Sequence, residues 1–177
     1  ISYCQVQQPT GIAIALTHSY AHPENEQYLA TQLRKAGFSF ICASHEVVPA
    51  IGFLHRSQTC IINTVLLPIL HQYLEDIQLK LGQSSLQLMT SAGGLWPKDS
   101  FKPVESLLSG PAGGVVGAKA IAELLGFDRM LSFDMGGTST DTAHYYQEFD
   151  YHYQSQTSDW ELLVPALGIE TVAAGGG

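Results

Sequence analysis

Residues 131–141 read Leu-Ser-Phe-Asp-Met-Gly-Gly-Thr-Ser-Thr-Asp, and this segment restricts the possible folds of the 177-residue chain more than any other. An apolar strand ends on Asp134, two glycines follow, and the stretch from Thr140 to Tyr146 predicts a second strand. Glycine permits positive φ angles, so consecutive N–H groups of the turn can converge on one anion. The segment therefore predicts a β-hairpin whose turn can bind phosphate.

The side chains of this hairpin suit a nucleotide with a bound metal ion. Thr138, Ser139 and Thr140 offer hydroxyl donors to phosphate oxygens, whereas the carboxylates of Asp134 and Asp141 suit Mg²⁺. The Gly-Lys-Ser/Thr sequence of a Walker A loop is missing, and a dinucleotide-binding turn would be followed by a helix instead of a strand. A tight hairpin turn without any ligand is the alternative interpretation.

Two further glycine clusters accompany the hairpin. Residues 109–125 predict a helix with Pro111 in its first turn and Ser109 or Gly110 as its cap. This helix contains three interior glycines, each costing about 1 kcal/mol relative to alanine. Close packing against a strand would explain them, as would an approach to phosphate. The glycines at 175–177 form either a second backbone surface for nucleotide or a flexible end.

The first part of the chain predicts a β-α-β unit. Residues 11–17 and 38–43 are short apolar runs typical of buried parallel strands, and a helix that begins near Pro23 connects them. A longer helix is predicted from residue 56 to residue 81, kinked or divided at Pro68.

The rest of the chain predicts mainly strands. Residues 85–90 read as a strand and 91–97 as a turn. Residues 149–154 and 161–172 predict an antiparallel meander with one solvated face after the hairpin. We place a domain boundary between residues 97 and 109.

Composition argues against several classes of protein. A net charge of −8 does not suit nucleic acid or an anionic membrane, and no run of about 18 apolar residues could span a bilayer. The three widely spaced cysteines lack zinc-site spacing and predict reduced thiols in the cytoplasm. The chain starts on Ile1 and ends on glycines, so we expect an internal fragment of a longer protein.

The histidines give weaker signals. His18 and His22 are four residues apart, but a strand-to-helix turn between them disfavours a shared metal-binding face. His45 and Glu46 follow the second predicted strand, at the edge where α/β sheets place ligands. Both a substrate contact and a simple surface turn are compatible with this position.

Six segments, in this order, resemble motifs of the hydantoinase A/5-oxoprolinase family, and they are spread over nearly the whole chain. They are ALTHSY (15–20) with Glu26, SHEVVP (44–49), MTSAGGL (89–95), LLSGPAGGVVGA (107–118), DMGGTSTD (134–141) and IETVAAGGG (169–177). The details are more similar to 5-oxoprolinases than to the carboxylase branch. Ala92 and the sequence Leu54-His55-Arg56 depart from the family pattern, which leaves the substrate open.

The resemblance implies an α/β fold of the RNase H-like, actin-like ATPase type, in which each of two halves supplies one phosphate-binding hairpin. Residues 1–105 would form the C-terminal part of the first domain. Residues 106–177 would supply the connecting helix and the start of the second domain, with its antiparallel meander. The first hairpin is absent, so we expect the isolated chain to be inactive.

The resemblance also implies an activity and a site. Members use ATP and Mg²⁺ to phosphorylate a lactam, imide or ketone oxygen, followed by hydrolytic ring opening or carboxylation. We expect opening of a 5-oxoproline- or hydantoin-type cyclic amide; the alternatives are a nucleotide-binding module and an ATP-dependent carboxylase subunit. Expected partners are the cyclic amide and either further copies of the protein or a hydantoinase B-type subunit or domain. The implied site residues are Asp134 and Asp141 (catalytic), Asp134 (metal), and Gly136, Gly137, Thr138, Ser139, Gly175 and Gly176 (nucleotide).

Overall fold

The computed structural model describes residues 1–157 and 159–176, which form two compact units. The first unit comprises the described residues of 1–86, 102–104 and 155–164, and the second those of 87–101, 105–154 and 165–177. The predicted assignment of residues 1–105 and 106–177 to two domains of a larger enzyme stays a prediction.

The first unit contains the predicted β-α-β arrangement. Strand β1 (Ile12–Ile14) pairs in parallel with β2 (Ile41–Ala43), and α2 (Glu24–Lys35) connects them. Helix α2 begins after Pro23, and it has acidic residues in its first turn and basic residues in its last, which suits the helix dipole. A short N-terminal helix, α1 (Ser2–Gln7), was not predicted.

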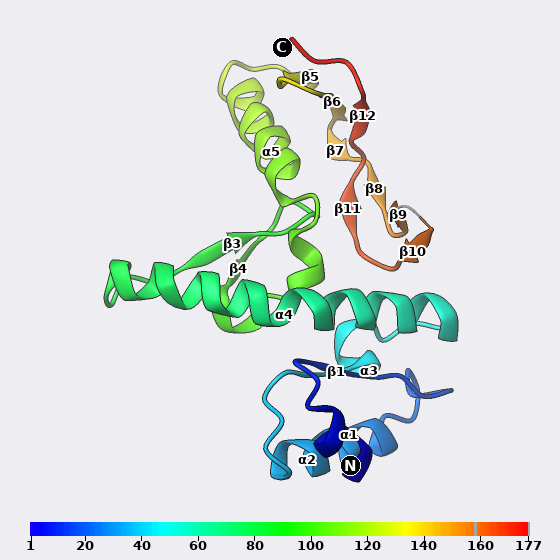
Figure 1. Ribbon diagram of the computed structural model, residues 1–177. Coiled ribbons are helices and arrows are strands. Elements are labelled where there is room, and N and C mark those ends of the chain that lie inside the picture. The colour runs from blue at the N-terminus through cyan, green and yellow to red at the C-terminus, as the bar shows by residue number, and fades with distance from the viewer. Residues whose placement is uncertain (158, 177) are drawn as a thin grey trace. The chain divides into compact units, whose positions relative to one another are not determined.

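Helix α4 (Phe53–Leu81) runs through Pro68 without being divided, so the predicted division is wrong (Figure 1). A proline inside a helix costs about 3 kcal/mol. Packing offsets that cost here, because α4 contacts β1, β2 and the short helix α3 (Ser44–Val47). The antiparallel strands β9 (Ser155–Thr157) and β10 (Trp160–Leu162) complete this unit. Its larger core consists of Cys42, Val47, Cys60, Val104, Leu162 and Val164.

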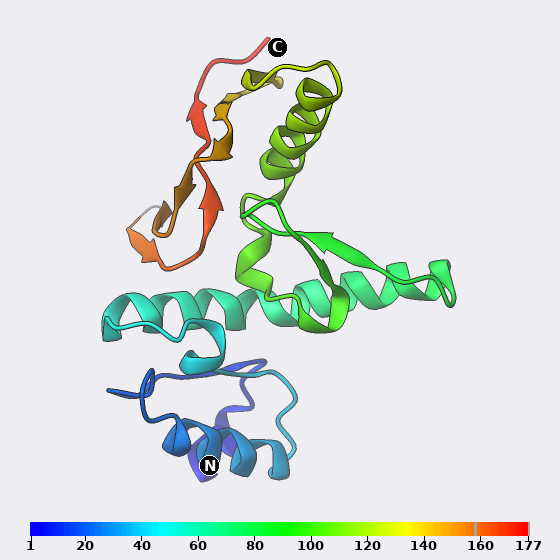
Figure 2. The ribbon, with the colours of Figure 1, turned by 180° about the vertical axis from the view of Figure 1, so that it is seen from behind.

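The second unit is built on an antiparallel sheet with the strand order β12-β6-β5, and β7 pairs with the far part of β6. The strands are β5 (Arg129–Met135), β6 (Thr140–Tyr146), β7 (Glu148–Phe149) and β12 (Glu170–Val172). Helix α5 (Ser109–Leu124) lies beside β5 and β6, as both ribbon views show (Figures 1 and 2). A buried cluster joins Ala112 and Val115 of α5 to Ala143 of β6, and Leu167 belongs to the same cluster.

Two more antiparallel pairs belong to this unit. Strand β8 (Tyr151–His152) pairs with β11 (Ala166–Leu167), and β3 (Gln87–Met89) pairs with β4 (Leu95–Pro97). The 3₁₀ helices η1 (Lys98–Ser100) and η2 (Pro103–Ser106) follow β4.

The predicted antiparallel character of the C-terminal part is confirmed, but the number of strands is higher than predicted. Residues 161–172 contain parts of three strands, because Pro165 and Gly168 interrupt the run and the Gly168 N–H bonds to the Asp150 carbonyl. Residues 95–97, predicted as part of a turn, form β4. Within the described residues, we find no helix that is both long and apolar enough to cross a membrane.

Candidate functional site

The predicted hairpin is present and consists of β5, a four-residue turn and β6. The last pairs of the ladder are Asp134 with Asp141 and Met135 with Thr140. The Gly136 N–H donates to the Ser139 carbonyl at 2.9 Å and closes the turn. The two carboxylates are therefore directly opposite each other on neighbouring strands and share one face of the sheet.

The glycines of the turn do not have the backbone conformation that the sequence suggested. The sequence predicted positive φ angles at the two glycines. Neither Gly136 nor Gly137 has a positive φ, so this prediction is wrong. The turn closes instead through the ordinary Gly136–Ser139 hydrogen bond. A Cβ added at Gly137 would meet no atom within 4 Å, so this glycine leaves open space beside the turn.

The C-terminal glycine segment lies directly on this turn. The Gly176 N–H donates to the Gly136 carbonyl at 3.0 Å. The backbone of Gly175 approaches the Gly137 carbonyl and the Thr138 nitrogen so closely that a Cβ at position 175 would collide with them. Glycine is therefore required at position 175 for the two segments to meet. The nucleotide-binding residues predicted on both segments are thus brought together; Gly177 lies outside the described residues.

The hydroxyl groups predicted to bind phosphate differ in availability. Thr138 is exposed and Ser139 is half-buried. Thr140 is buried, and its hydroxyl donates to the Ala174 carbonyl at 2.5 Å. Thr140 therefore anchors the C-terminal segment, which corrects its predicted role as a phosphate ligand.

Helix α5 differs from the prediction at its start. Leu108 is the N-cap residue, no side chain caps the helix, and Pro111 is its third residue. Close packing does not explain the interior glycines either, because Cβ atoms at Gly114 and Gly117 would meet nothing within 4 Å and one at Gly113 would only touch Met89 at 3.8 Å. These glycines keep one side of the helix open.

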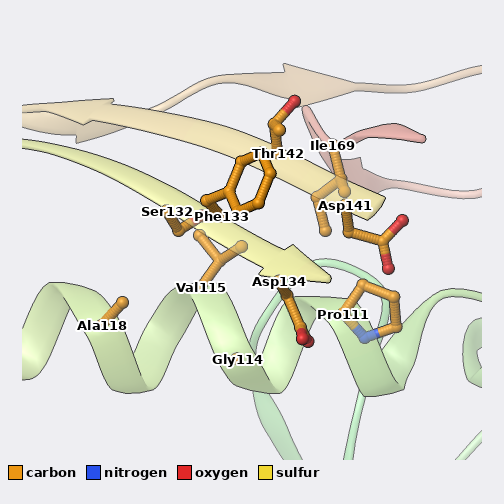
Figure 3. A pocket seen from close by; sticks show the side chains of 10 residues that line it. All are labelled: Pro111, Gly114, Val115, Ala118, Ser132, Phe133, Asp134, Asp141, Thr142 and Ile169. Atoms are coloured by element: carbon orange, nitrogen blue, oxygen red, sulfur yellow. The ribbon is translucent and has the colours of Figure 1, made fainter. Parts of the chain in front are cut away.

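A cavity of about 260 Å³ lies between α5 and the hairpin. Figure 3 shows the Asp134 side chain pointing from β5 toward α5, with Asp141 near Pro111 at the same end of the cavity. Gly114 and Ala118 line the helix side and leave the volume open because they are small. The full lining is Pro111, Gly114, Val115, Ala118, Ser132, Phe133, Asp134, Asp141, Thr142 and Ile169.

The carboxylates at this cavity can hold a cation only together with other ligands. Asp141 Oδ1 accepts a hydrogen bond from the Thr171 hydroxyl at 2.6 Å, which orients it, and Asp134 is exposed. In the part of the chain that the structure describes, no group of three or more His, Cys, Asp or Glu side chains could hold a metal ion by itself. Mg²⁺ suits this donor set, because it usually takes one or two carboxylates and completes its shell with water and phosphate oxygens.

A polar cluster in the first unit was not singled out from the sequence as a site. Glu26 is completely buried and Arg56 is 1% exposed, although both are charged. The sequence held one signal for this cluster: Glu26 occupies the same face of α2 as the buried Ala30 and Leu33, at spacings of four and seven residues. An acid within an apolar helical stripe indicates a buried polar partner.

Comparison with known proteins finds a family model and individual relatives that agree with one another. The model of the family described as Hydantoinase/oxoprolinase matches residues 56–177. The 5-oxoprolinase PfmaA of Pestalotiopsis fici is 37% identical over 169 residues, which covers 94% of this chain and 13% of that protein.

Two solved structures have the same fold over this length. The ATP-dependent caprolactamase from Pseudomonas jessenii gives a TM-score of 0.86 at 30% identity, covering 99% of this chain and 27% of that one. Nucleotide-free acetone carboxylase gives a TM-score of 0.77 at 29% identity, covering 98% of this chain and 26% of that one. The chain thus has the mixed α/β fold of part of these larger proteins and spans between 13% and 27% of their lengths.

Proposed function

Because this chain belongs to the hydantoinase/oxoprolinase family, we propose that it forms part of an ATP-dependent enzyme that hydrolytically opens a cyclic amide. Its relatives include a 5-oxoprolinase and an ATP-dependent caprolactamase, and both names denote hydrolysis of a cyclic amide. A 5-oxoproline- or hydantoin-type ring is the proposed substrate class. The proposed architecture has two RNase H-like halves, of which this chain contributes the second phosphate hairpin.

One observation carries this proposal: the predicted nucleotide-binding segments, far apart in sequence, meet at the turn of the hairpin whose strands supply Asp134 and Asp141 to the cavity. The turn at 136–139 contacts the segment 174–176, and the carboxylates of Asp134 and Asp141 line the cavity beside them. A glycine-rich turn next to acidic side chains suits a phosphate with its magnesium ion.

Each part has a separate proposed task. Bound ATP would supply the phosphoryl group that activates the amide oxygen. Gly137 would offer its backbone N–H to phosphate, since this N–H has no hydrogen-bond partner among the described residues, and the exposed Thr138 would offer its hydroxyl. Asp134 would hold Mg²⁺. The carboxylate of Asp141, which the Thr171 hydroxyl orients, would supply a second negative charge beside the ion. A cyclic-amide substrate and a hydantoinase B-type partner or further copies belong to the same proposal, as does a cytoplasmic location.

The substitution Asp134→Asn in the full-length protein tests this assignment. It preserves size and removes the charge, so we expect kcat for cyclic-amide-dependent ATP hydrolysis to fall roughly 10²-fold or more, about 2.7 kcal/mol in barrier height. The melting temperature should change little, because Asp134 is exposed. Titration with a fluorescent ATP analogue should show weaker Mg²⁺-dependent binding.

Asp128→Asn is the matched control, because Asp128 is an exposed acid in the same unit that does not line the cavity. It should leave both readouts unchanged. If Asp134→Asn instead melts earlier and keeps its Mg²⁺-dependent kcat, Asp134 only stabilises the hairpin and the assignment is wrong.

An ATP-dependent carboxylase is a second candidate, supported by the structural match to acetone carboxylase. The same assay separates the two functions. ATP turnover that requires 5-oxoproline, hydantoin or caprolactam supports the hydrolase, and turnover that requires a ketone and bicarbonate supports the carboxylase. Turnover that depends on neither would indicate a nucleotide-binding module of the same fold.

A further inference from the structure

One face of the sheet in the second unit exposes large apolar side chains. Successive side chains of a strand point to opposite faces of the sheet. On β5, Asp134 points toward α5, and Figure 3 shows Phe133 on the other side of the strand. Leu131, Phe133 and Met135 alternate along β5 and therefore share the face that points away from α5. They are 76%, 64% and 52% exposed, so we call this side of the sheet the bare face.

The neighbouring strands extend the bare face. Residues directly opposite each other in an antiparallel ladder share a face. His144 of β6 is opposite Leu131 of β5. Met135 and Val172 both pair with Thr140, one from each side, and thus belong to one row across the sheet. Val172 is 56% exposed. The bare face is therefore continuous over three strands and has apolar side chains on both outer strands.

Two hollows in the bare face meet at Leu131 and His144, which line both of them. The first hollow has a volume of about 170 Å³ and extends to Asp150 and Glu170. The second has a volume of about 450 Å³ and extends to Arg129 at the start of β5. The Leu131–His144 pair thus separates two hollows that the side chains of another element can fill.

The charges around the two hollows differ in sign. Asp150 and Glu170 line the first hollow together with His152, whose Nε2 lies 3.6 Å from Asp150 Oδ2. Arg129 lines the second hollow, with its guanidinium carbon 4.4 Å from the centre of the Tyr146 ring. A complementary segment would place Lys or Arg over the first hollow and Asp or Glu over the second.

The side chains of the bare face do not suit a surface in contact with water. An antiparallel sheet that is solvated on one side normally has polar side chains on that side. Strand β5 instead has three large apolar side chains there, and it is also the edge strand of the sheet in the described part of the chain. An exposed apolar edge strand promotes aggregation, so natural proteins cover or pair it.

The length of the relatives indicates what covers the bare face. This chain spans between 13% and 27% of the lengths of its relatives, so most of each relative lies outside the matched part. In mixed α/β proteins helices cover the faces of a sheet, and α5 already covers one face of this sheet. A helix of the same polypeptide can cover the other face without the entropic cost of association between two molecules.

We propose that a helix from the part of the full-length polypeptide outside residues 1–177 packs on the bare face. Its apolar stripe covers Leu131, Phe133 and Met135, and its Lys or Arg side chains lie over the first hollow. This contact is on the opposite side of the sheet from the cavity beside α5. It goes beyond the proposed function, since it holds for a hydrolase and for a carboxylase alike.

Hydroxyl-radical footprinting of the wild-type full-length protein tests whether the bare face is covered. We expect Leu131, Phe133 and Met135 to be oxidised roughly tenfold more slowly in the native protein than in urea, because buried side chains react only after local opening. Mass spectrometry of the peptides measures these rates. Equal rates in both states would show an open face and overturn the proposal. Protection that disappears on dilution to the monomer would show that a second copy covers the face, which also overturns it.

The variant Phe133→p-benzoylphenylalanine, made in the full-length protein, identifies the covering segment by photo-cross-linking. Irradiation should join position 133 to a peptide of the same chain, outside residues 1–177, with apolar residues at helical spacing and a Lys or Arg beside them. Phe127→p-benzoylphenylalanine is the matched control, because Phe127 is 61% exposed but precedes β5. The control should not link to that peptide.

Other products of irradiation would overturn the proposal. A cross-link between two chains would mean that a second copy covers the bare face, and a link within residues 1–177 would mean that another part of this chain does. A folded variant that gives no cross-link would show that no polypeptide lies on this face. Leu131→p-benzoylphenylalanine is the second variant if the first does not fold, and the wild-type footprint decides if neither folds.

Discussion

The stability of the first unit should fall on acidification because of Glu26. Burial raises the pKa of Glu26, but the hydrogen bonds from His45, Ser44 and Ser19 lower it further, so the folded-state pKa is about 2, against an ordinary value of 4.5. A carboxyl whose pKa is lowered by folding stabilises the protein fully above its unfolded-state pKa, and this stabilisation is lost as the pH falls through the folded-state value. The difference amounts to about 3 kcal/mol in the free energy of unfolding, of which about 2 kcal/mol should be lost by pH 3.

Urea unfolding at pH 6 and pH 3 measures this effect. The chain contains two tryptophans, so Trp96→Phe leaves Trp160, in the first unit, as the fluorescent reporter. Adding Glu26→Gln to this background gives a reference protein that cannot ionise at position 26, and the comparison cancels the titration of all other carboxyls. The stability difference between the background protein and its Glu26→Gln variant should shrink by about 2 kcal/mol between pH 6 and pH 3. An equal difference at both pH values would refute the reasoning, because Glu26 would then have an ordinary pKa in the folded state.

Two further predictions concern packing. Gly175→Ala should displace the C-terminal segment from the hairpin turn, because its Cβ would collide with Gly137 and Thr138. The backbone N–H of Gly176 should then exchange with solvent much faster. Gly137→Ala is the control, because its Cβ has open space, and it should leave the exchange rate of Gly176 unchanged. Slow exchange in Gly175→Ala would show that the contact does not need glycine. Cys60 should resist alkylation by iodoacetamide at pH 8 until the chain unfolds, because burial raises its thiol pKa to about 12. Cys4 is partly exposed and should react first. Equal alkylation rates of Cys4 and Cys60 would contradict the burial of Cys60.

Local sequence signals determined the main elements and the hairpin. Two short apolar runs, separated by Pro23 and the acids of α2, were sufficient to predict the β-α-β unit. Strands and the ends of helices depend mainly on residues that are neighbours in the sequence. The hairpin was predictable for the same reason, because Asp134 and Asp141 flank a glycine turn only a few residues long. The family followed from the order of such segments.

The tertiary structure decided how distant segments meet. The sequence could not show that Gly175 packs on Gly137 or that the Leu163 N–H donates to the Thr59 hydroxyl across 104 positions of the chain. The position of Glu26 in the apolar stripe of α2 indicated a buried polar partner, but the sequence did not identify His45 as that partner. Contacts of this kind depend on the path of the backbone between the residues. For that reason the sequence located the hairpin, whereas only the folded chain revealed the segment that packs on its turn and the hydrogen bond between Glu26 and His45 beside β2.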